Sequence, residues 1–245
     1  MGRIKLIVEY VGTGYCGWQS QKNGVSVQDT LEKALAQFLH KSFVRVYAAG
    51  RTDVGVHARG QTVHLDVDED VNPFKLCLGV NLLLPPDLSV VDAAKVSDDF
   101  DARFDAVDKT YCYRMYVSPT RRPTLDVFCL QVYKMPDVSA MREGAKLLVG
   151  RHDFAAFQNS GSNLKGTVRT VNGLDVVQKG SVLEFWVNGT AFLYNQVRNM
   201  CGLLLEVGYG LPLSAVGDML QGKRVRYKTL PAKGLTLEKV NYEKN

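Results

Sequence analysis

The segment at residues 49–61 holds the residues whose types and spacing are best suited to chemistry. It reads AGRTDVGVHARGQ, with three glycines, two arginines, one carboxylate and one imidazole. Glycines allow close approach, Arg51 and Arg59 can hold phosphates, and cations flanking Asp53 keep that carboxylate ionised, as a nucleophile or general base must be. From spacing alone, the simpler interpretation is that Asp53 caps a turn beside a surface arginine.

His57, in the same segment, is not assigned a catalytic role. A lone histidine with no second ligand-type residue four positions on is usually a hydrogen-bonded structural group. No histidine stands beside a nucleophile-elbow pattern, so a Ser or Cys triad and metal-assisted hydrolysis are weakly supported. The five cysteines are odd in number, scattered and never spaced C-x-x-C, which favours reduced thiols. We expect no metal site and no cofactor.

The glycines Gly12, Gly14 and Gly17 spell G-x-G-x-x-G directly after a predicted strand. The pattern is typical of a dinucleotide-binding turn, but such a turn must open straight into a helix that holds the pyrophosphate. Here a polar loop follows, and Gln37 stands roughly 20 residues on, where an acidic residue would be needed. A nicotinamide-dependent enzyme is therefore the least favoured alternative.

Two further segments carry side chains that could contact a substrate. Residues 109–114 predict a strand on which Tyr111 and Tyr113 share one face, where aromatic rings either stack on bases or, more often, pack a core. Residues 192–200 place Arg198 after an apolar turn at the start of a long helix. An arginine there can pair with a buried carboxylate or face water.

Apolar alternation and helix caps predict the elements that must position these segments. Residues 4–10 alternate in the manner of a half-buried strand, and Ser26 followed by Asp29 predicts the start of a helix. In the first half we further expect strands at 44–48, 62–68 and 88–93, a loop at 50–60 and a helix at 73–84.

In the second half the order of elements repeats, without any repeat at the level of residues. A helix at 138–149 is predicted between Asp137 as cap and Gly150 as stop. We also expect strands at 111–117, 174–178, 183–187 and 235–242 and helices at 192–207 and 213–220. Strands and helices in this order favour α+β sandwiches.

Composition limits the class of protein. A chain of 245 residues with 46% hydrophobic content can build one or two domains. It has no apolar stretch of about 18 residues and no hydrophobic leader, so we expect a cytoplasmic protein without a membrane span. Its net charge of +5 permits a polyanionic partner without demanding one.

The motifs are more informative together than singly. They are YVGTGYCGWQSQ at 10–21, AGRTDVGVHARGQ at 49–61, KTYCYR at 109–114, HDFAAF at 152–157, FLYNQVRNMCG at 192–202 and PAKGLTLEKVNY at 231–242. This set resembles the tRNA pseudouridine synthase A family over nearly the whole chain. Two residues differ from the ones more frequent in that family, Val54 in place of Ala and Gln196 in place of Met.

The resemblance implies an α+β fold of two similar sandwich domains, each an antiparallel sheet with helices on one face, at residues 1–106 and 107–245. The sheets would continue across the domain junction, with an RNA cleft between the domains. It also implies a homodimer that binds tRNA, and an isomerase that converts uridine to pseudouridine in the anticodon stem-loop without a cofactor. A non-catalytic RNA-binding protein is the main rival.

The resemblance also assigns roles to single residues. Asp53 corresponds to the nucleophile, Tyr111 to the tyrosine that packs against the target base, and Arg198 to the arginine that pairs with the catalytic carboxylate. Leu235 corresponds to an apolar residue of the pocket, and Arg51 to an arginine that helps the base to leave its stack. Arg59 is expected to contact RNA phosphates.

Overall fold

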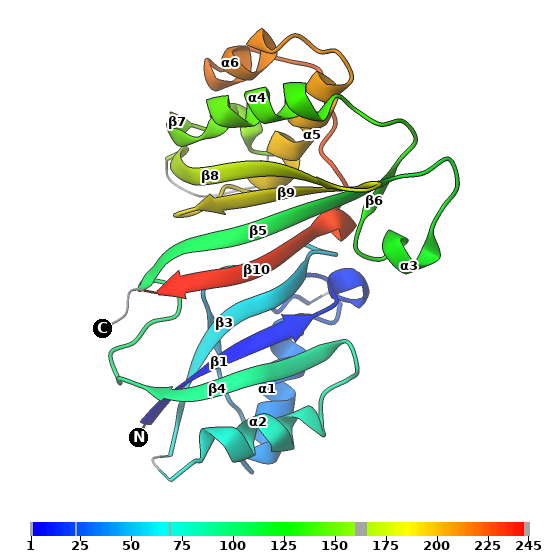
Figure 1. The fold of residues 1–245 in the computed structure, drawn as a ribbon. Helices are drawn as coiled ribbons and strands as arrows, with labels where there is room; N and C mark the ends of the chain where they lie inside the picture. The colour runs from blue at the N-terminus through cyan, green and yellow to red at the C-terminus, as the bar shows by residue number, and fades with distance from the viewer. Residues whose placement is uncertain (1, 23, 69, 160–165, 243–245) are drawn as a thin grey trace. The chain divides into compact units, whose positions relative to one another are not determined.

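A computed structural model describes residues 2–22, 24–68, 70–159 and 166–242 of the chain (Figure 1). The chain forms two compact units, which we call unit 1 (Met1–Val107 with Leu237–Asn245) and unit 2 (Asp108–Thr236). Each unit contains strands, paired almost entirely in antiparallel fashion, and helices. The α+β fold class predicted from the sequence is therefore confirmed.

Unit 1 is built from a central strand with neighbours on both sides. β1 pairs antiparallel with β3 and with β4, β10 follows β3 in the strand order, and β2 pairs with β3. The strands are β1 (Gly2–Tyr10), β2 (Tyr47–Ala48), β3 (His57–Val67), β4 (Leu88–Val96) and the part of β10 (Leu235–Tyr242) from Leu237 onward, and the helices are α1 (Val27–Phe38) and α2 (Pro73–Asn81).

The core of unit 1 follows from the alternation in β1. Ile4 is opposite Leu65 and Leu6 is opposite Val63, and all four side chains are fully buried. Figure 1 shows α1 behind these strands. The helix starts as predicted, because the Ser26 hydroxyl accepts a hydrogen bond from the backbone N–H of Asp29 at 3.0 Å.

The C-terminal strand belongs to unit 1 from Leu237 onward, whereas the domain expected from the sequence comprised all of residues 107–245. Close backbone approach explains the difference: a Cβ on Gly60 of β3 would lie 2.5 Å from the carbonyl oxygen of Glu238. The Tyr242 hydroxyl also donates to the carbonyl of Ala102 at 2.6 Å. These contacts join segments that are far apart in sequence, so local sequence patterns do not predict them.

Unit 2 has the strand order β5-β9-β8-β7, and β6 runs parallel to β5. Its elements are β5 (Ala106–Val117), α3 (Pro123–Asp126), β6 (Leu130–Val132), α4 (Val138–Leu148), β7 (Gly150–Asp153), β8 (Val168–Lys179), β9 (Val182–Gly189), α5 (Gln196–Gly208) and α6 (Ser214–Leu220).

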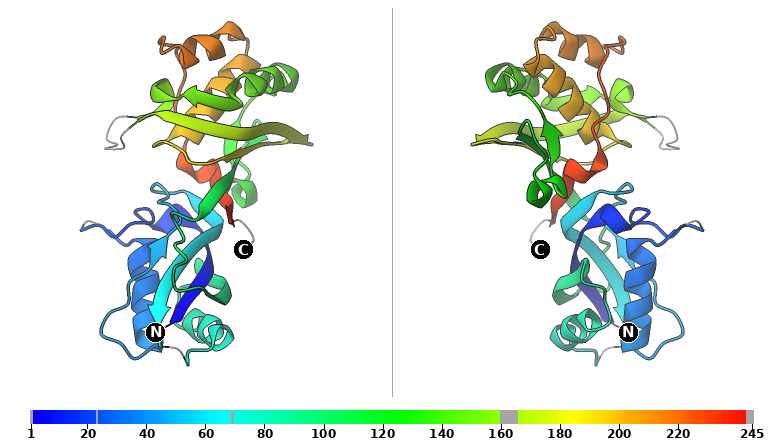
Figure 2. Two further views of the ribbon diagram at one scale, coloured as in Figure 1. Left: turned by 90° about the vertical axis from the view of Figure 1, so that its left-hand side faces the viewer. Right: turned by 90° about the vertical axis from the view of Figure 1, so that its right-hand side faces the viewer.

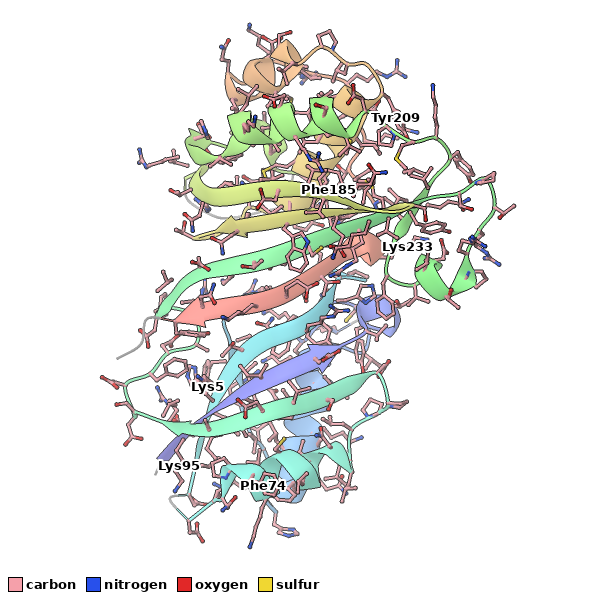
Figure 3. The ribbon with its side chains drawn as sticks, viewed as in Figure 1. Lys5, Phe74, Lys95, Phe185, Tyr209 and Lys233 are labelled. Atoms are coloured by element: carbon pink, nitrogen blue, oxygen red, sulfur yellow. The ribbon has the colours of Figure 1, made fainter. Side chains whose placement is uncertain are left out.

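The core of unit 2 lies between its strands and the helices α4 and α5. Tyr113 of β5 is opposite Phe185 of β9, and both side chains are fully buried. Figure 3 shows Phe185 on the side of the strands that the helices cover. In both views of Figure 2, α6 lies beyond α4 and α5, away from β8 and β9.

Several predicted boundaries are wrong. β3 begins at His57 and not at residue 62, because Ala58 and Gln61 already pair with β1 around a bulge, so the expected loop at 50–60 is shorter. α5 begins at Gln196 and not at 192, because Asn195 has a left-handed backbone with φ of 62°. β6, β7 and α3 were not predicted. No helix among the described residues is long and apolar enough to cross a membrane.

Candidate active site

Asp53 lies on the loop between β2 and β3, at residues 49–56, which we call the Asp loop. The N–H of Ala49 donates to the carbonyl of Thr62 at the start of the loop, at 2.8 Å. At its end, the N–H of Val56 donates to the carbonyl of Asp53 at 3.1 Å, which closes a tight turn. Asp53 is half-buried and its neighbour Val54 is 61% exposed, so the turn lies at the surface of unit 1.

The residues just before Asp53 are fixed from outside the loop. The N–H of Trp18 donates to the carbonyl of Thr52 at 3.1 Å, and the hydroxyls of Tyr10 and Thr52 are 2.8 Å apart. The amide of Gln61 donates to the carbonyl of Gly50 at 2.8 Å. Burial raises the pKa of the Tyr10 phenol above its usual value, so this hydroxyl stays neutral.

His57 has the structural surroundings that the sequence suggested. It is 2% exposed, and its Nδ1 accepts a hydrogen bond from the N–H of Gly12 at 3.0 Å. The segment around Gly12 forms a short 3-10 turn, Gly12–Gly14, and α1 begins only at Val27. No helix therefore opens at Gly17, as a dinucleotide-binding turn requires.

Arg51 and Arg59, predicted to contact RNA, are both exposed. The guanidinium of Arg59 lies 3.5 Å from the carboxylate of Glu238, and the Arg59 side chain is 60% exposed. The Glu238 side chain is only 10% exposed, but the guanidinium faces solvent, so water weakens the pair from the arginine side. Arg51 lies two residues before Asp53, on the same loop.

In unit 2, Tyr111 lies on β5 and packs edge-on against Phe192, with ring centroids 5.4 Å apart. Tyr113 shares its face of the strand, as predicted, but is fully buried and donates to the carbonyl of Pro231 at 2.8 Å. Burial raises the pKa of the Tyr113 phenol well above its usual value. Tyr111 keeps 9% of its surface exposed, so it is the more accessible of the two rings.

Arg198 is the third residue of α5, and its own unit orients the guanidinium. Its Nε donates to the carbonyl of Leu230 at 2.6 Å, and its Nη1 donates to Oδ1 of Asn195 at 2.5 Å. The left-handed backbone of Asn195 turns the chain into the helix at this point. Arg198 is half-buried, so these contacts fix a charged group near the surface of unit 2.

Leu235 is the first residue of β10 and is 6% exposed. Its position is set by Gly234, because a Cβ there would lie 2.6 Å from the ring of Tyr113 and 2.9 Å from the carbonyl oxygen of Arg114. Leu235 therefore follows a point of close packing in unit 2.

Sequence reasoning missed the role of two asparagines around the start of α5. Besides Asn195, the amide of Asn199 donates to the carbonyl of Phe157 at 2.7 Å, and its Oδ1 accepts from Thr229 at 2.6 Å. Asn199 thus joins the HDFAAF turn, α5 and the segment before β10. The signal available in the sequence was two asparagines, four positions apart, at the start of a helix whose later turns are mostly apolar.

The chemistry open to this set of residues is acid–base or nucleophilic. Among the described residues, no group of three or more His, Cys, Asp or Glu side chains could hold a metal ion. The five cysteines are free thiols, and three of them are buried. Asp53 offers a half-buried carboxylate on a loop held by main-chain hydrogen bonds, and Arg198 offers a guanidinium oriented by two hydrogen bonds.

Comparisons with known proteins add a family. A family model described as tRNA pseudouridine synthase matches residues 6–105 and 145–243. A protein of Syntrophotalea carbinolica named tRNA pseudouridine synthase A is 45% identical, over 99% of this chain and 97% of that protein. Proteins of the same name from Myxococcus xanthus and Burkholderia mallei are 44% and 41% identical, over 99% of this chain and 92% and 90% of theirs.

A solved structure of a Cbf5–Nop10–Gar1 complex is similar with a TM-score of 0.34 and 12% identity. The match covers 84% of this chain and 54% of that one. A similarity at this level supports no statement about fold or function.

Proposed function

This chain belongs to the tRNA pseudouridine synthase family, and from that premise we propose that it isomerises uridine to pseudouridine in tRNA through the carboxylate of Asp53. The family model and the named relatives together span nearly the whole chain, which makes the protein an isomerase that acts on tRNA.

The reaction suits a single carboxylate. Isomerisation breaks the glycosidic bond, turns the uracil and joins its C5 to the ribose, with no net oxidation and no group gained or lost. A carboxylate can attack the base, attack the ribose or assist loss of a ribose proton. Each of these routes needs an ionised Asp53 and neither a hydride donor nor a metal.

The observation that carries the assignment is the way in which the Asp loop is held. Main-chain hydrogen bonds fix Thr52 and Val56 on either side of Asp53, while the carboxylate itself is half-buried and adjoins the exposed Val54. A catalytic group has to be held close to its productive geometry by rigid neighbours. A carboxylate that merely capped a turn would not need support from a distant segment.

We assign supporting roles to three residues of unit 2. Tyr111 would pack against the target base, Leu235 would line the apolar side of the pocket, and Arg198 would pair with Asp53. The motif FLYNQVRNMCG supports the role of Arg198, and so does the orientation of its guanidinium by Asn195. Pairing with a guanidinium would keep the carboxylate ionised when the bound nucleotide excludes water.

We assign RNA contacts to Arg51 and Arg59, with Arg51 helping the target uridine to leave its stack. Unstacking a nucleotide costs a few kcal/mol, which stacking on Tyr111 and phosphate contacts would offset. The finer proposals are that the target lies in the anticodon stem-loop, that tRNA binds in a cleft between the two domains, and that the enzyme acts as a homodimer in the cytoplasm.

The decisive experiment incubates the purified protein with unmodified tRNA and nothing else, and then measures pseudouridine by mass spectrometry. We expect pseudouridine to form at stem-loop positions, at the same rate with EDTA and without nicotinamide. A protein that binds tRNA but forms no pseudouridine would support the rival, a non-catalytic RNA-binding protein. Activity lost in EDTA and restored by a metal ion would contradict the cofactor-free mechanism.

A further inference from the structure

We propose that the glycine-rich segment at residues 12–18, which we call the brace, positions the Asp loop for catalysis, with Gly12 and His57 as positioning residues. The proposal rests on the proposed function, because it takes Asp53 to be the group that reacts. It gives a role to the G-x-G-x-x-G pattern, which the dinucleotide interpretation left without one.

The backbone of Gly12 packs directly against the end of the Asp loop and leaves no room for a side chain. A Cβ on Gly12 would lie 2.0 Å from the carbonyl oxygen of Val56 and 2.6 Å from its carbonyl carbon. The N–H of Gly12 donates to Nδ1 of His57, the next residue. This hydrogen bond requires Nδ1 to be unprotonated, so a neutral His57 joins the brace to the point where β3 begins.

Gly17 and Trp18 make the matching contact on the other side of Asp53. Gly17 has φ of +97°, and a Cβ there would lie 2.9 Å from the carbonyl oxygen of Thr52. That same oxygen accepts the hydrogen bond from the N–H of Trp18. The brace therefore contacts the residue before Asp53 and the residue that closes the turn after it.

The brace is itself held by regular structure. The N–H of Val27 donates to the carbonyl of Gly17 at 3.2 Å, and the N–H of Gln28 donates to that of Trp18 at 3.0 Å. Both donors belong to the first turn of α1, whose N–H groups have no partner within the helix. At the other end, the N–H of Val11 donates to the carbonyl of Asp87 at 2.9 Å. The first turn of α1 therefore holds the end of the brace, and Asp87, the residue before β4, holds Val11, the residue that precedes the brace.

Gly14 provides a matched control within the same motif. It is exposed, and the nearest atom to a Cβ built on it is a carboxylate oxygen of Asp87 at 3.6 Å, an ordinary van der Waals distance. Gly12 and Gly14 lie two residues apart in the same 3-10 turn, yet only Gly12 abuts the Asp loop.

The first test compares Gly12→Ala with Gly14→Ala. The added methyl group at Gly12 must displace the carbonyl of Val56 by more than 1 Å to reach an ordinary contact distance. A displacement of that size at a catalytic group lowers turnover by about 100-fold. We expect Gly12→Ala to lower kcat by this amount with KM for tRNA within about twofold of the wild type. Gly14→Ala should retain wild-type kcat and KM.

The second test separates positioning from stability at His57. His57→Asn places an amide oxygen near the position of Nδ1 and can still accept from Gly12, whereas His57→Leu fills the space without an acceptor. We expect His57→Leu to lower kcat by about tenfold or more and His57→Asn to restore most of it. Thermal unfolding is measured for each variant, and kcat is expressed per folded protein.

Asp53→Asn is assayed in parallel, so that the two proposals can fail separately. If Asp53→Asn is inactive while folded Gly12→Ala and His57→Leu both keep wild-type kcat, the brace proposal is wrong. If Gly12→Ala does not fold, the His57 pair decides: equal kcat for His57→Leu and the wild type overturns the proposal, and rescue by His57→Asn supports it. An active Asp53→Asn overturns the proposed function first, and the brace proposal with it.

Discussion

The Asp loop of unit 1 and the start of α5 in unit 2 fix their charged side chains by different means. Around Asp53 the contacts are mostly between main-chain groups, such as the N–H of Trp18 with the carbonyl of Thr52. Glycines make this possible because they let two backbones approach within contact distance.

At the start of α5 the guanidinium itself is held. Nε of Arg198 donates to the carbonyl of Leu230, but Nη1 donates to another side chain, that of Asn195. The two charged groups are therefore sensitive to different substitutions. A loop held by its backbone is sensitive to added atoms at glycines, whereas an arginine held by a side chain is sensitive to atoms removed from its neighbour.

The largest effect is expected for the carboxylate itself. Asp53→Asn keeps the shape but cannot act as nucleophile or base, so we expect turnover to fall by at least about 10³-fold. Because the loop is held by its backbone, thermal unfolding and tRNA affinity should stay close to the wild type. Val54→Ala, at the exposed neighbour, is the matched control and should retain full activity. Residual turnover within about tenfold of the wild type would exclude Asp53 as the reacting group.

Replacing Arg198 tests the other side of the comparison. If Arg198 pairs with Asp53 as proposed, Arg198→Met removes a positive charge that favours the ionised carboxylate, so Asp53 takes up a proton at higher pH and the acid limb of the kcat profile moves upward. Turnover should fall by about 10²-fold, more than tRNA affinity does. Arg198→Lys should be intermediate, since an ammonium cannot reproduce the two contacts to Asn195 and Leu230 in one plane. An unchanged maximal rate and acid limb in Arg198→Met would show that Arg198 does not act on Asp53.

A smaller effect is expected when only the support of Arg198 is removed. Asn195→Gly preserves the left-handed backbone, which glycine adopts freely, but loses the acceptor for Nη1. We expect kcat to fall by about three- to tenfold with little change in KM. Asn195→Asp keeps an acceptor in place and should stay closer to the wild type. Equal activity of the glycine and aspartate variants would mean that the side-chain contact is not needed.

The smallest expected effects are those of the exposed arginines on tRNA binding. Affinity should fall steeply with salt if phosphate contacts are made by Arg51 and Arg59 and by a further set of residues, Arg121, Arg122, Lys223, Arg224 and Arg226. Arg51→Ala should reduce the slope of log affinity against log salt by about 1. Arg59→Ala should reduce it less, because Arg59 already faces the carboxylate of Glu238. Flat binding between low and moderate salt would contradict both placements.

The sequence by itself determined the elements with strong local signals. Alternation defined β1, and the caps Ser26 and Asp137 marked the starts of α1 and α4, because a cap side chain bonds to N–H groups only two or three residues away. The motifs also singled out Asp53 and Arg198, because residue types and order survive in the chain whatever its fold. These features depend on neighbours in sequence.

Tertiary structure alone decided how those residues are supported. Gly12 and His57 are 45 positions apart, so nothing local shows that the N–H of one bonds to Nδ1 of the other. Asn195 takes a left-handed conformation that its own sequence only permits, and this shortened α5 relative to its apolar pattern. Long-range contacts of this kind form only when the whole unit packs. Until the two segments are brought together, their hydrogen-bonding groups cannot pair with each other.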